Sequence, residues 1–255
     1  MSLSINIESA GYRSKQVISG LNFTLEKGSL SAIIGRNGSG KSTLISTLSG
    51  LIGFKGDVIL DGVSLTGKER KEHAKMISTM LQSLKKPHIT VKELVSFGRN
   101  PYVSLNRPLQ KNDLMIIDKA IDTASLTQLE YAYLDAISGG ELRRAYLAMI
   151  LAQDTEIMLL DESTAFMDAS FENDFMRILL DLCKKEGKIV LFVTHNIDLA
   201  VEYADNVLVL ENGKQLFFGK TSELLNTEVI EEHFQLKRYK AENKIFFSVS
   251  RNEEK

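Results

Sequence analysis

The sequence is short of cysteine and of net charge, and both shortages exclude classes of protein. Cys183 is the single cysteine among 255 residues, so no disulfide can form within the chain, which suits a reducing compartment. No acid–base partner lies near Cys183 in the sequence, and we expect a buried thiol on a helix. The formal net charge of −2 leaves no basic excess, so we expect no nucleic acid among the partners.

Long apolar runs and an export signal are also missing. The most apolar stretches, such as Ile189–Val193, are far shorter than the roughly 20 residues that span a bilayer. Residues Met1–Asn6 have neither the basic region nor the apolar region of a secretory signal. The composition, 44% hydrophobic and 25% charged, is ordinary for a soluble domain. We therefore expect a soluble chain that reaches a membrane only through a partner.

Instead, the sequence has short apolar runs that alternate with helical stretches. This alternation predicts a parallel sheet that is covered on both faces. The pair Asn212-Gly213 separates two of the runs and predicts an antiparallel hairpin. We expect strands over 30–34, 157–160, 189–193, 207–210 and 215–218, and helices over 42–51 and 198–204.

The middle of the chain differs, because helical periodicity dominates from about Lys85 to Ala152. Thr90 and Glu93 have the spacing of a capping box, which predicts a helix start, and Gly98–Pro101 predicts the end of that helix. We therefore predict a single domain, 1–255, in which a helical subdomain is inserted into an α/β core. The core is expected over about 1–84 and 156–255, and the helical subdomain over about 85–155.

The most specific motif is Gly35-Arg36-Asn37-Gly38-Ser39-Gly40-Lys41-Ser42, which matches the phosphate-binding pattern G-x-x-x-x-G-K-[ST]. Its glycines let backbone N–H groups point at phosphate oxygens, and the helix that follows adds the positive end of its dipole. A chance Gly-rich turn is the alternative, but the predicted strand before the motif and helix after it favour nucleotide binding. Lys41 is expected to reach the β- and γ-phosphates, and Ser42 to ligate Mg²⁺. The expected nucleotide contacts are Gly35, Asn37, Gly38, Ser39, Gly40, Lys41, Ser42 and Thr43.

Two carboxylates follow the predicted strand 157–160. Asp161 is placed to hold Mg²⁺ beside the phosphate loop, and Glu162 to orient and deprotonate the attacking water. Two solvated carboxylates at a strand end are the alternative interpretation. The phosphate loop upstream favours the interpretation in which Asp161 and Glu162 take part in catalysis.

A third motif, Ser138-Gly139-Gly140-Glu141, precedes a predicted amphipathic helix. Ser138 and Glu141 have capping-box spacing, and Gly139 and Gly140 leave the helix N-terminus open to an anion. A plain helix cap explains the spacing equally well, although it does not explain the two glycines.

In this order, the motifs resemble the nucleotide-binding subunit of the ABC transporter family over nearly the whole chain. Gln82, His195 and Tyr12 occupy further positions of that family's pattern. The resemblance implies an α/β fold. Its P-loop NTPase core has a mostly parallel sheet, an antiparallel β edge and an inserted helical subdomain. It also implies ATP hydrolysis, with ATP and Mg²⁺ as cofactors.

The resemblance further implies that two such subunits pair head to tail around two ATP molecules, with Ser138 of one subunit on the γ-phosphate held by the other. Tyr12 would stack on adenine, although an ordinary tyrosine is the alternative. His195 would contact the γ-phosphate, and Gln82 would connect the Mg²⁺ and water site to the membrane partner. Asp168 occupies the aspartate position of the interface loop. That loop departs from the family pattern Pro-Thr-Ser-x-Leu-Asp, because it reads Ser-Thr-Ala-Phe-Met-Asp over 163–168.

Three stretches, 90–101, 151–155 and 194–200, resemble importers of iron–siderophore, haem and cobalamin type. The expected partners are integral-membrane permease subunits, a second ATP-binding subunit and, indirectly, a substrate-binding protein, at the cytoplasmic face of the cell membrane. A zinc or manganese importer remains an alternative, as does a soluble ATPase without a permease, of the type that serves iron–sulfur assembly. The interval from Lys41 to Asp161 lacks the sustained heptads of a chromosome-maintenance ATPase.

Overall fold

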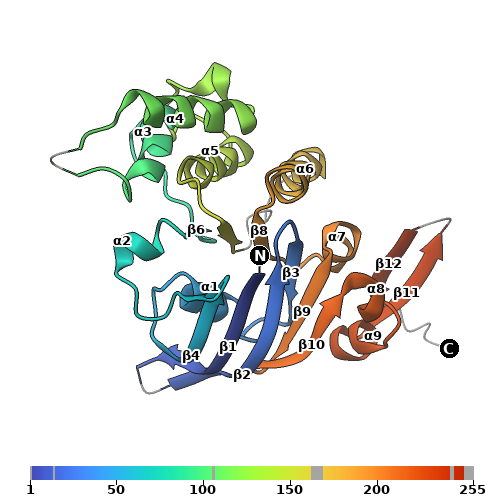
Figure 1. Cartoon of the computed structure of the whole chain (residues 1–255). Coiled ribbons are helices and arrows are strands. Elements are labelled where there is room, and N and C mark those ends of the chain that lie inside the picture. The colour runs from blue at the N-terminus through green and yellow to red at the C-terminus, as the bar shows by residue number, and fades with distance from the viewer. Residues whose placement is uncertain (1, 14, 105–106, 162–168, 242–243, 250–255) are drawn as a thin grey trace.

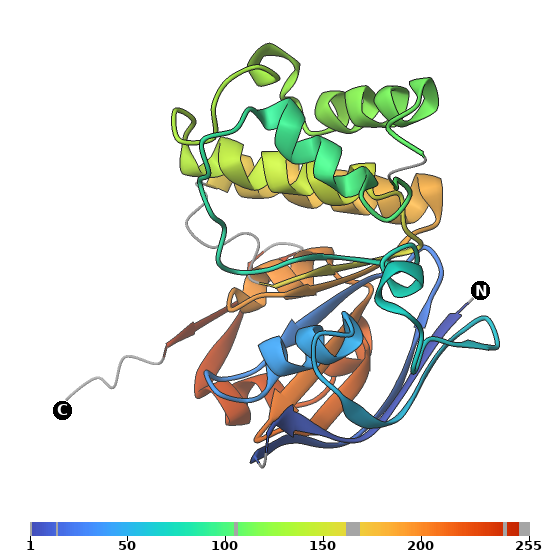
Figure 2. The ribbon, with the colours of Figure 1, turned by 90° about the vertical axis from the view of Figure 1, so that its left-hand side faces the viewer.

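An α/β core lies below a layer of helices in the computed structural model, which describes residues 2–13, 15–104, 107–161, 169–241 and 244–249 (Figure 1). The view turned by 90° shows the same two layers, with the helical layer above the sheets (Figure 2). Glu162 and Asp168 lie outside the described residues.

The central sheet has six strands in the order β10-β9-β3-β8-β7-β6. All neighbouring pairs are parallel except β9 and β10, which are antiparallel at one edge. Every residue of β3, β7 and β8 is buried, as expected for parallel strands covered on both faces. The predicted mostly parallel sheet with an antiparallel edge is therefore confirmed. The strands are β3 (Leu30–Ile34), β6 (Ile77–Met80), β7 (Ile157–Leu160), β8 (Ile189–Val193), β9 (Asn206–Glu211) and β10 (Lys214–Lys220).

The predicted hairpin at Asn212-Gly213 is also confirmed. Glu211 pairs with Lys214, so the loop between β9 and β10 has two residues. Asn212 and Gly213 have φ angles of 48° and 77°, the left-handed values that a tight type I′ turn requires.

A second sheet covers one side of the core, and its strands run antiparallel in the order β2-β1-β4-β5. In β1, apolar residues such as Leu3, Ile5 and Ile7 are fully buried and alternate with more exposed ones, so one face packs inward. This sheet was not predicted from the sequence. Its strands are β1 (Ser2–Tyr12), β2 (Lys15–Glu26), β4 (Phe54–Leu60) and β5 (Val63–Ser64).

Helix α1 (Lys41–Leu48) packs between the two sheets, where Leu44 and Ile45 share a hydrophobic core with both. The predicted helix over 42–51 was too long at its C-terminal end. Gly50 has φ of 71° and its N–H donates to Thr47 O, while Leu51 N–H reaches back to Ser46 O. This is a Schellman motif, which ends a helix at a left-handed glycine.

The opposite face of the central sheet is covered by α6 (Ala169–Glu186), α7 (Ile197–Tyr203), α8 (Thr221–Leu224) and α9 (Val229–Phe234). Cys183 lies on α6 and is fully buried, which confirms the predicted helical thiol. Burial raises the pKa of this thiol to about 12. The chain continues into the hairpin of β11 (Leu236–Ala241) and β12 (Lys244–Val249), which packs on the same core through Phe247.

The helical layer has a hydrophobic core of its own, with members such as Leu94, Ile121 and Leu142. The capping box of Thr90 and Glu93 at the start of α3 is confirmed. Among the described residues, no helix combines the length and apolar character that crossing a bilayer requires. The elements between β5 and β7 other than β6 are α2 (Arg70–His73), α3 (Val91–Ser96), η1 (Phe97–Arg99), α4 (Lys111–Thr123), η2 (Thr127–Leu129) and α5 (Gly139–Ala152).

Candidate nucleotide-binding site

Four parallel strands bring predicted site residues together at the carboxyl ends of the strands in the central sheet. The phosphate loop follows β3, Gln82 lies beyond the end of β6, Asp161 follows β7 and His195 lies beyond the end of β8. Ligands of open α/β sheets bind outside the carboxyl ends of the strands. Since neighbouring strands are about 4.8 Å apart, the loop and Asp161, two strands apart, are separated by roughly 10 Å across the sheet.

The phosphate loop adopts backbone conformations that glycine permits. Gly38 and Gly40 have φ angles of 79° and 104°, and Gly40 is the left-handed N-cap of α1. Among the described residues no side chain caps this helix, and the first N–H groups of any α-helix have no acceptor within the helix itself. An anion at the N-terminus of α1 supplies such acceptors.

The side chain of Lys41 folds back onto the phosphate loop. Its Nζ donates to Gly35 O over 2.8 Å and to Arg36 O over 3.1 Å, and the residue is 5% exposed. The loop thus holds a positive charge at the end of β3, where phosphate would bind.

A cavity of about 310 Å³ opens at this loop. Six of the eight predicted nucleotide contacts line it, and Gly35 and Ser39 do not. Ser39 lies beneath the surface, and its buried Oγ has no hydrogen-bond partner among the described residues. The cavity is lined by Asn37, Gly38, Gly40, Lys41, Ser42 and Thr43, together with Lys15 and Val17 of β2.

Lys15 adds a second cation to the cavity, although it was not predicted from the sequence as a site residue. Tyr12, predicted to contact adenine, pairs with Lys15 across the β1–β2 hairpin and is 48% exposed. Tyr12 is therefore paired in the hairpin with a residue that lines the phosphate cavity. Only the short distance from Tyr12 to Lys15 in the sequence could have drawn attention to this lysine.

The β9–β10 turn supports the phosphate loop through a backbone hydrogen bond. Gly213 N–H donates to Ser39 O over 2.9 Å, and Gly213 O accepts from Ser19 N–H over 2.8 Å. A Cβ on Gly213 would lie 1.7 Å from Val17 O, so glycine is needed for this close approach. The Asn-Gly pair was visible in the sequence, but its contact with the loop was not.

Asp161, Gln82 and His195 differ in their exposure. Asp161 is 4% exposed, and its N–H donates to Met80 O over 2.8 Å. Gln82 and His195 are exposed at the same carboxyl ends of the strands. The residue before His195, Thr194, donates its N–H to Ile33 O and so ties this end of β8 to β3.

The Ser138 motif lies elsewhere, at the N-terminus of α5 in the helical layer (Figure 1). The predicted capping box is confirmed, since Ser138 N–H donates to Glu141 Oε2 over 2.8 Å and Glu141 N–H donates to Ser138 Oγ over 3.3 Å. The Ser138 hydroxyl and backbone N–H hold the pKa of Glu141 below its usual value. Gly139 faces open space, with Arg143 Nη1 4.0 Å from an added Cβ. The fold does not bring this motif to the chain's own phosphate loop.

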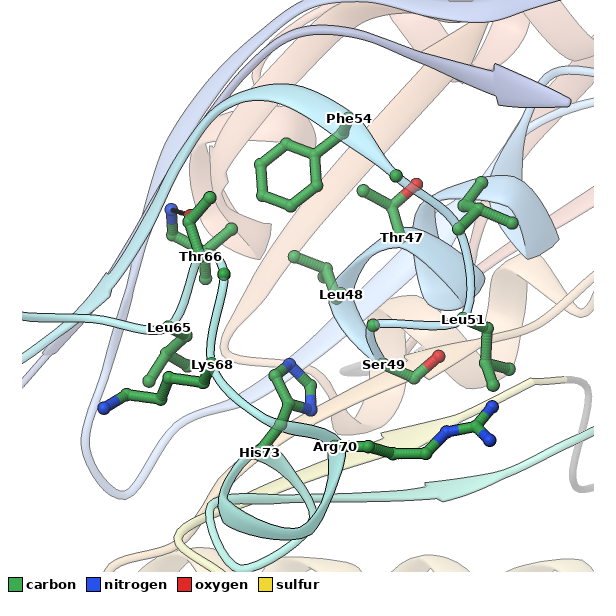
Figure 3. Close-up of a pocket in the computed structure, with 15 residues that line it drawn as sticks. Thr47, Leu48, Ser49, Leu51, Phe54, Leu65, Thr66, Lys68, Arg70 and His73 are labelled. Atoms are coloured by element: carbon green, nitrogen blue, oxygen red, sulfur yellow. Dashed lines mark hydrogen bonds between the residues drawn. The ribbon is translucent and has the colours of Figure 1, made fainter. Parts of the chain in front are cut away.

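A second cavity, of about 330 Å³, contains none of the predicted site residues (Figure 3). It lies between the end of α1 and α2, and Leu48, Phe54, Leu65 and His73 are among its lining residues. Burial lowers the pKa of His73. The neighbouring Lys71 donates to Val103 O over 3.0 Å, so α2 also touches the segment that follows η1.

Known proteins resemble this chain over most of its length. The ABC transporter family profile matches residues 18–165. The petrobactin import ATP-binding protein YclP of Bacillus subtilis is 37% identical over 227 residues, which are 88% of this chain and 89% of that protein. The ferric enterobactin transport ATP-binding protein FepC of Escherichia coli is 38% identical over 89% of this chain and 84% of its own length.

A similar fold occurs in a solved structure of a transporter described as metal-chelate type, in an inward-facing conformation. The TM-score is 0.81 and the identity 25%, and the match covers 96% of this chain and 95% of the solved one.

Proposed function

Because the chain belongs to the ABC transporter family, we propose that it is the ATP-binding and ATP-hydrolysing subunit of a membrane importer whose cargo is an iron chelate. The assignment of the cargo rests on the 38% identity to a ferric enterobactin transport subunit over 89% of this chain. The zinc or manganese importer and the ATPase without a permease gain no support from the relatives described above.

The ATP site is assigned to the phosphate loop and its surroundings. Lys41 and the loop N–H groups bind the phosphates, and the cavity of about 310 Å³ at the loop supports this assignment. Phosphoryl transfer is catalysed mainly by positioning and by charge around the γ-phosphate, so these contacts also serve catalysis. His195 contacts the γ-phosphate, and the exposed Tyr12 stacks on adenine. Glu162, outside the described residues, is the base for the attacking water.

Magnesium accompanies the nucleotide, with Ser42, Asp161 and Gln82 as its protein ligands. Their hydroxyl, carboxylate and amide oxygens are the hard ligands that the ion prefers, and Mg²⁺ at phosphate sites uses few protein groups. The nearly buried Asp161 at the end of β7 supports the fit. The described residues contain no cluster of three or more potential His, Cys, Asp or Glu ligands, and this mode of binding needs none. When bound, the ion neutralises phosphate charge.

A second ATP-binding subunit completes the site. Ser138, Gly139 and Gly140 lie in the helical layer, away from their own phosphate loop, so we assign them to the nucleotide of a paired copy. Asp168, outside the described residues, is assigned to the same interface. To move the pair from 1% to 99% closed, ATP must favour the closed form by about 5.5 kcal/mol.

The membrane permease docks on the helical subdomain, which we assign to about 85–155 within the single domain 1–255. We assign the contact with the permease to residues 85–102. This segment leads into Val103, which accepts a hydrogen bond from Lys71 of α2, so the contact lies next to the cavity at α2. This places the chain at the cytoplasmic face of the membrane. A substrate-binding protein takes part indirectly, through the permease.

Affinity purification of the tagged full chain from detergent-solubilised native membranes tests the proposal. Mass spectrometry is expected to identify a many-helix permease, and ATPase activity of the purified complex should rise when binding protein loaded with a ferric chelate is added. An untagged strain provides the control. Recovery of soluble partners alone contradicts the importer, and stimulation by a zinc-loaded or manganese-loaded binding protein contradicts the cargo.

A further inference from the structure

Two of the stretches that resemble iron-chelate importers, 90–101 and 151–155, meet at the C-terminal end of α5. Gly98 packs so closely on this helix that a Cβ would lie 2.2 Å from Met149 O. Arg99 Nη1 donates to Ala152 O over 2.8 Å. The hydroxyl of Tyr102 donates to Gln153 O over 3.0 Å. Because the last carbonyl groups of a helix have no partner within it, these bonds hold the end of α5 in place.

A buried ion pair ties the same point to α4. Arg99 is 5% exposed and Asp113 is 1% exposed, and two nitrogens of Arg99 contact Asp113 Oδ1 at 2.9 and 3.0 Å. Asp113 Oδ2 accepts the N–H of Gln110, the N-cap of α4, over 3.0 Å. The guanidinium also lies 4.0 Å above the ring of Tyr102. A buried ion pair adds little net stability compared with apolar packing, so its geometry is the more informative property.

Gln153 joins this end of α5 to the core. Its Nε2 donates to Ala74 O over 2.5 Å and to Ile77 O over 3.1 Å. Ala74 is the C-cap of α2, and Ile77 is the first residue of β6. Both N–H donors of one side-chain amide are therefore used, one to the end of α2 and one to the first residue of β6 in the central sheet.

We propose that Arg99, Tyr102, Asp113 and Gln153, here called the α5 anchor, are positioning residues that set the angle between α5 and the core. The anchor lies at one end of α5, and Ser138 lies at the other. With 14 residues, α5 is about 20 Å long, so a rotation of about 10° moves Ser138 by roughly 3–4 Å. A displacement of about 1 Å can lower an enzymatic rate about 100-fold. The effect on turnover rests on the proposed function, whereas the geometric role does not.

Distances between spin labels on the full chain test the geometric role. Cysteines replace Lys55 on β4 and Lys111 at the start of α4, both exposed, while the buried Cys183 stays unlabelled. Gln153→Met keeps the length of the side chain and removes both donors. The interlabel distance distribution is expected to shift or broaden by several ångströms, on the scale of the helix displacement above. Thr123→Val, which removes only a bond to Lys119 O within α4, is the matched control. A wild-type distribution in Gln153→Met overturns the proposal, as does an equal change in the control.

Turnover in the assembled permease complex tests the consequence. Gln153→Met is expected to lower kcat roughly 10- to 100-fold, while the Kd for ATP of the isolated chain stays that of the wild type. Tyr102→Phe is a milder second variant, should Gln153→Met fail to fold, and is expected to lower kcat without changing the Kd. Unchanged kcat in both variants overturns the positioning role. A wild-type complex without ATP turnover contradicts the proposed function, and the distance measurement then still decides on the anchor.

Discussion

Gly213 N–H donates a hydrogen bond of 2.9 Å to Ser39 O, so the turn of the β9–β10 hairpin supports the phosphate loop. The same turn accepts a bond from Ser19 on β2. Three segments that are far apart in the sequence therefore shape the loop together.

Gly213→Ala is expected to weaken both stability and ATP binding. An alanine here combines a left-handed φ of 77° with a Cβ placed 1.7 Å from Val17 O, so the turn must move. We expect a loss of about 2 kcal/mol or more in the free energy of unfolding, measured by urea denaturation. Gly62→Ala is the control, since Gly62 has φ of 81° but open space around it, and strain alone costs about 1 kcal/mol. Equal losses in the two variants would contradict the support that Gly213 gives to the loop.

Lys41→Ala is expected to weaken ATP binding about tenfold or more, because a charge-assisted phosphate contact contributes about 1.5–3 kcal/mol. Isothermal titration of the isolated chain measures the Kd. Lys214→Ala, which removes a lysine from the exposed start of β10, should leave the Kd unchanged. An unaltered Kd in Lys41→Ala would count against the assignment of the phosphate loop.

Glu162→Gln is expected to retain ATP binding while turnover falls roughly 10²- to 10⁴-fold, because the amide cannot accept the proton of the attacking water. Phosphate release by the permease complex reports turnover, and size-exclusion chromatography with ATP should reveal a trapped dimer. Wild-type turnover in this variant would remove Glu162 as the base.

Ser138→Ala separates a helix cap from a nucleotide contact. Losing the cap of α5 should cost about 1 kcal/mol in the free energy of unfolding. Glu223→Ala removes a side chain that accepts the N–H of Lys220 at the start of α8, and its cost should be similar. If Ser138 also contacts nucleotide in a paired copy, only Ser138→Ala lowers ATP turnover. Equal turnover in the two variants would leave Ser138 with its capping role alone.

Acid should destabilise the chain partly through Asp113. Hydrogen bonds from Gln110 N–H and from Arg99 hold the pKa of Asp113 below its ordinary 3.8. A lowered folded-state pKa stabilises the fold above about 3.8, and this contribution is lost as pH falls through the folded-state pKa. Asp113→Asn should therefore be several kcal/mol less stable than wild type at pH 7, on the order of 3–5 kcal/mol. Urea denaturation between pH 7 and pH 2 should show this difference narrowing below about pH 4; a constant difference would contradict the assignment.

Much of the central sheet was predictable because its strands are short, fully apolar and bounded by clear turn residues. The bounds of β3, β7 and β8 match the predicted ranges, and the position of the hairpin followed from Asn212-Gly213. The antiparallel sheet of β1, β2 and β4 was missed, although the alternation at Leu3, Ile5 and Ile7 indicates a strand. Alternation alone does not identify the partner of a strand, because pairing depends on distant residues.

The phosphate loop was predictable because one contiguous stretch contains its chemistry. Lys15 and Gly213 were not predicted as site residues, because they reach the loop only after β2 and the hairpin have packed against it. The α5 anchor shows the same limit, since Arg99 and the Ala152 carbonyl to which it donates are 53 positions apart, and neither residue type indicates a contact with the other. The catalytic roles of Glu162, His195 and Gln82 stay predictions.

The bond from Gly213 to Ser39 also bears on how the chain is made. The phosphate loop lies near the beginning of the sequence, yet its support comes from a turn more than 170 residues later. Contacts of such long range form late, because much of the chain must first be ordered. While residue 213 has not yet left the ribosome, the phosphate loop of the nascent chain has no support from the β9–β10 turn. ATP then stabilises the partly made chain little. Nucleotide binding during synthesis would report that β9 and β10 have joined the sheet.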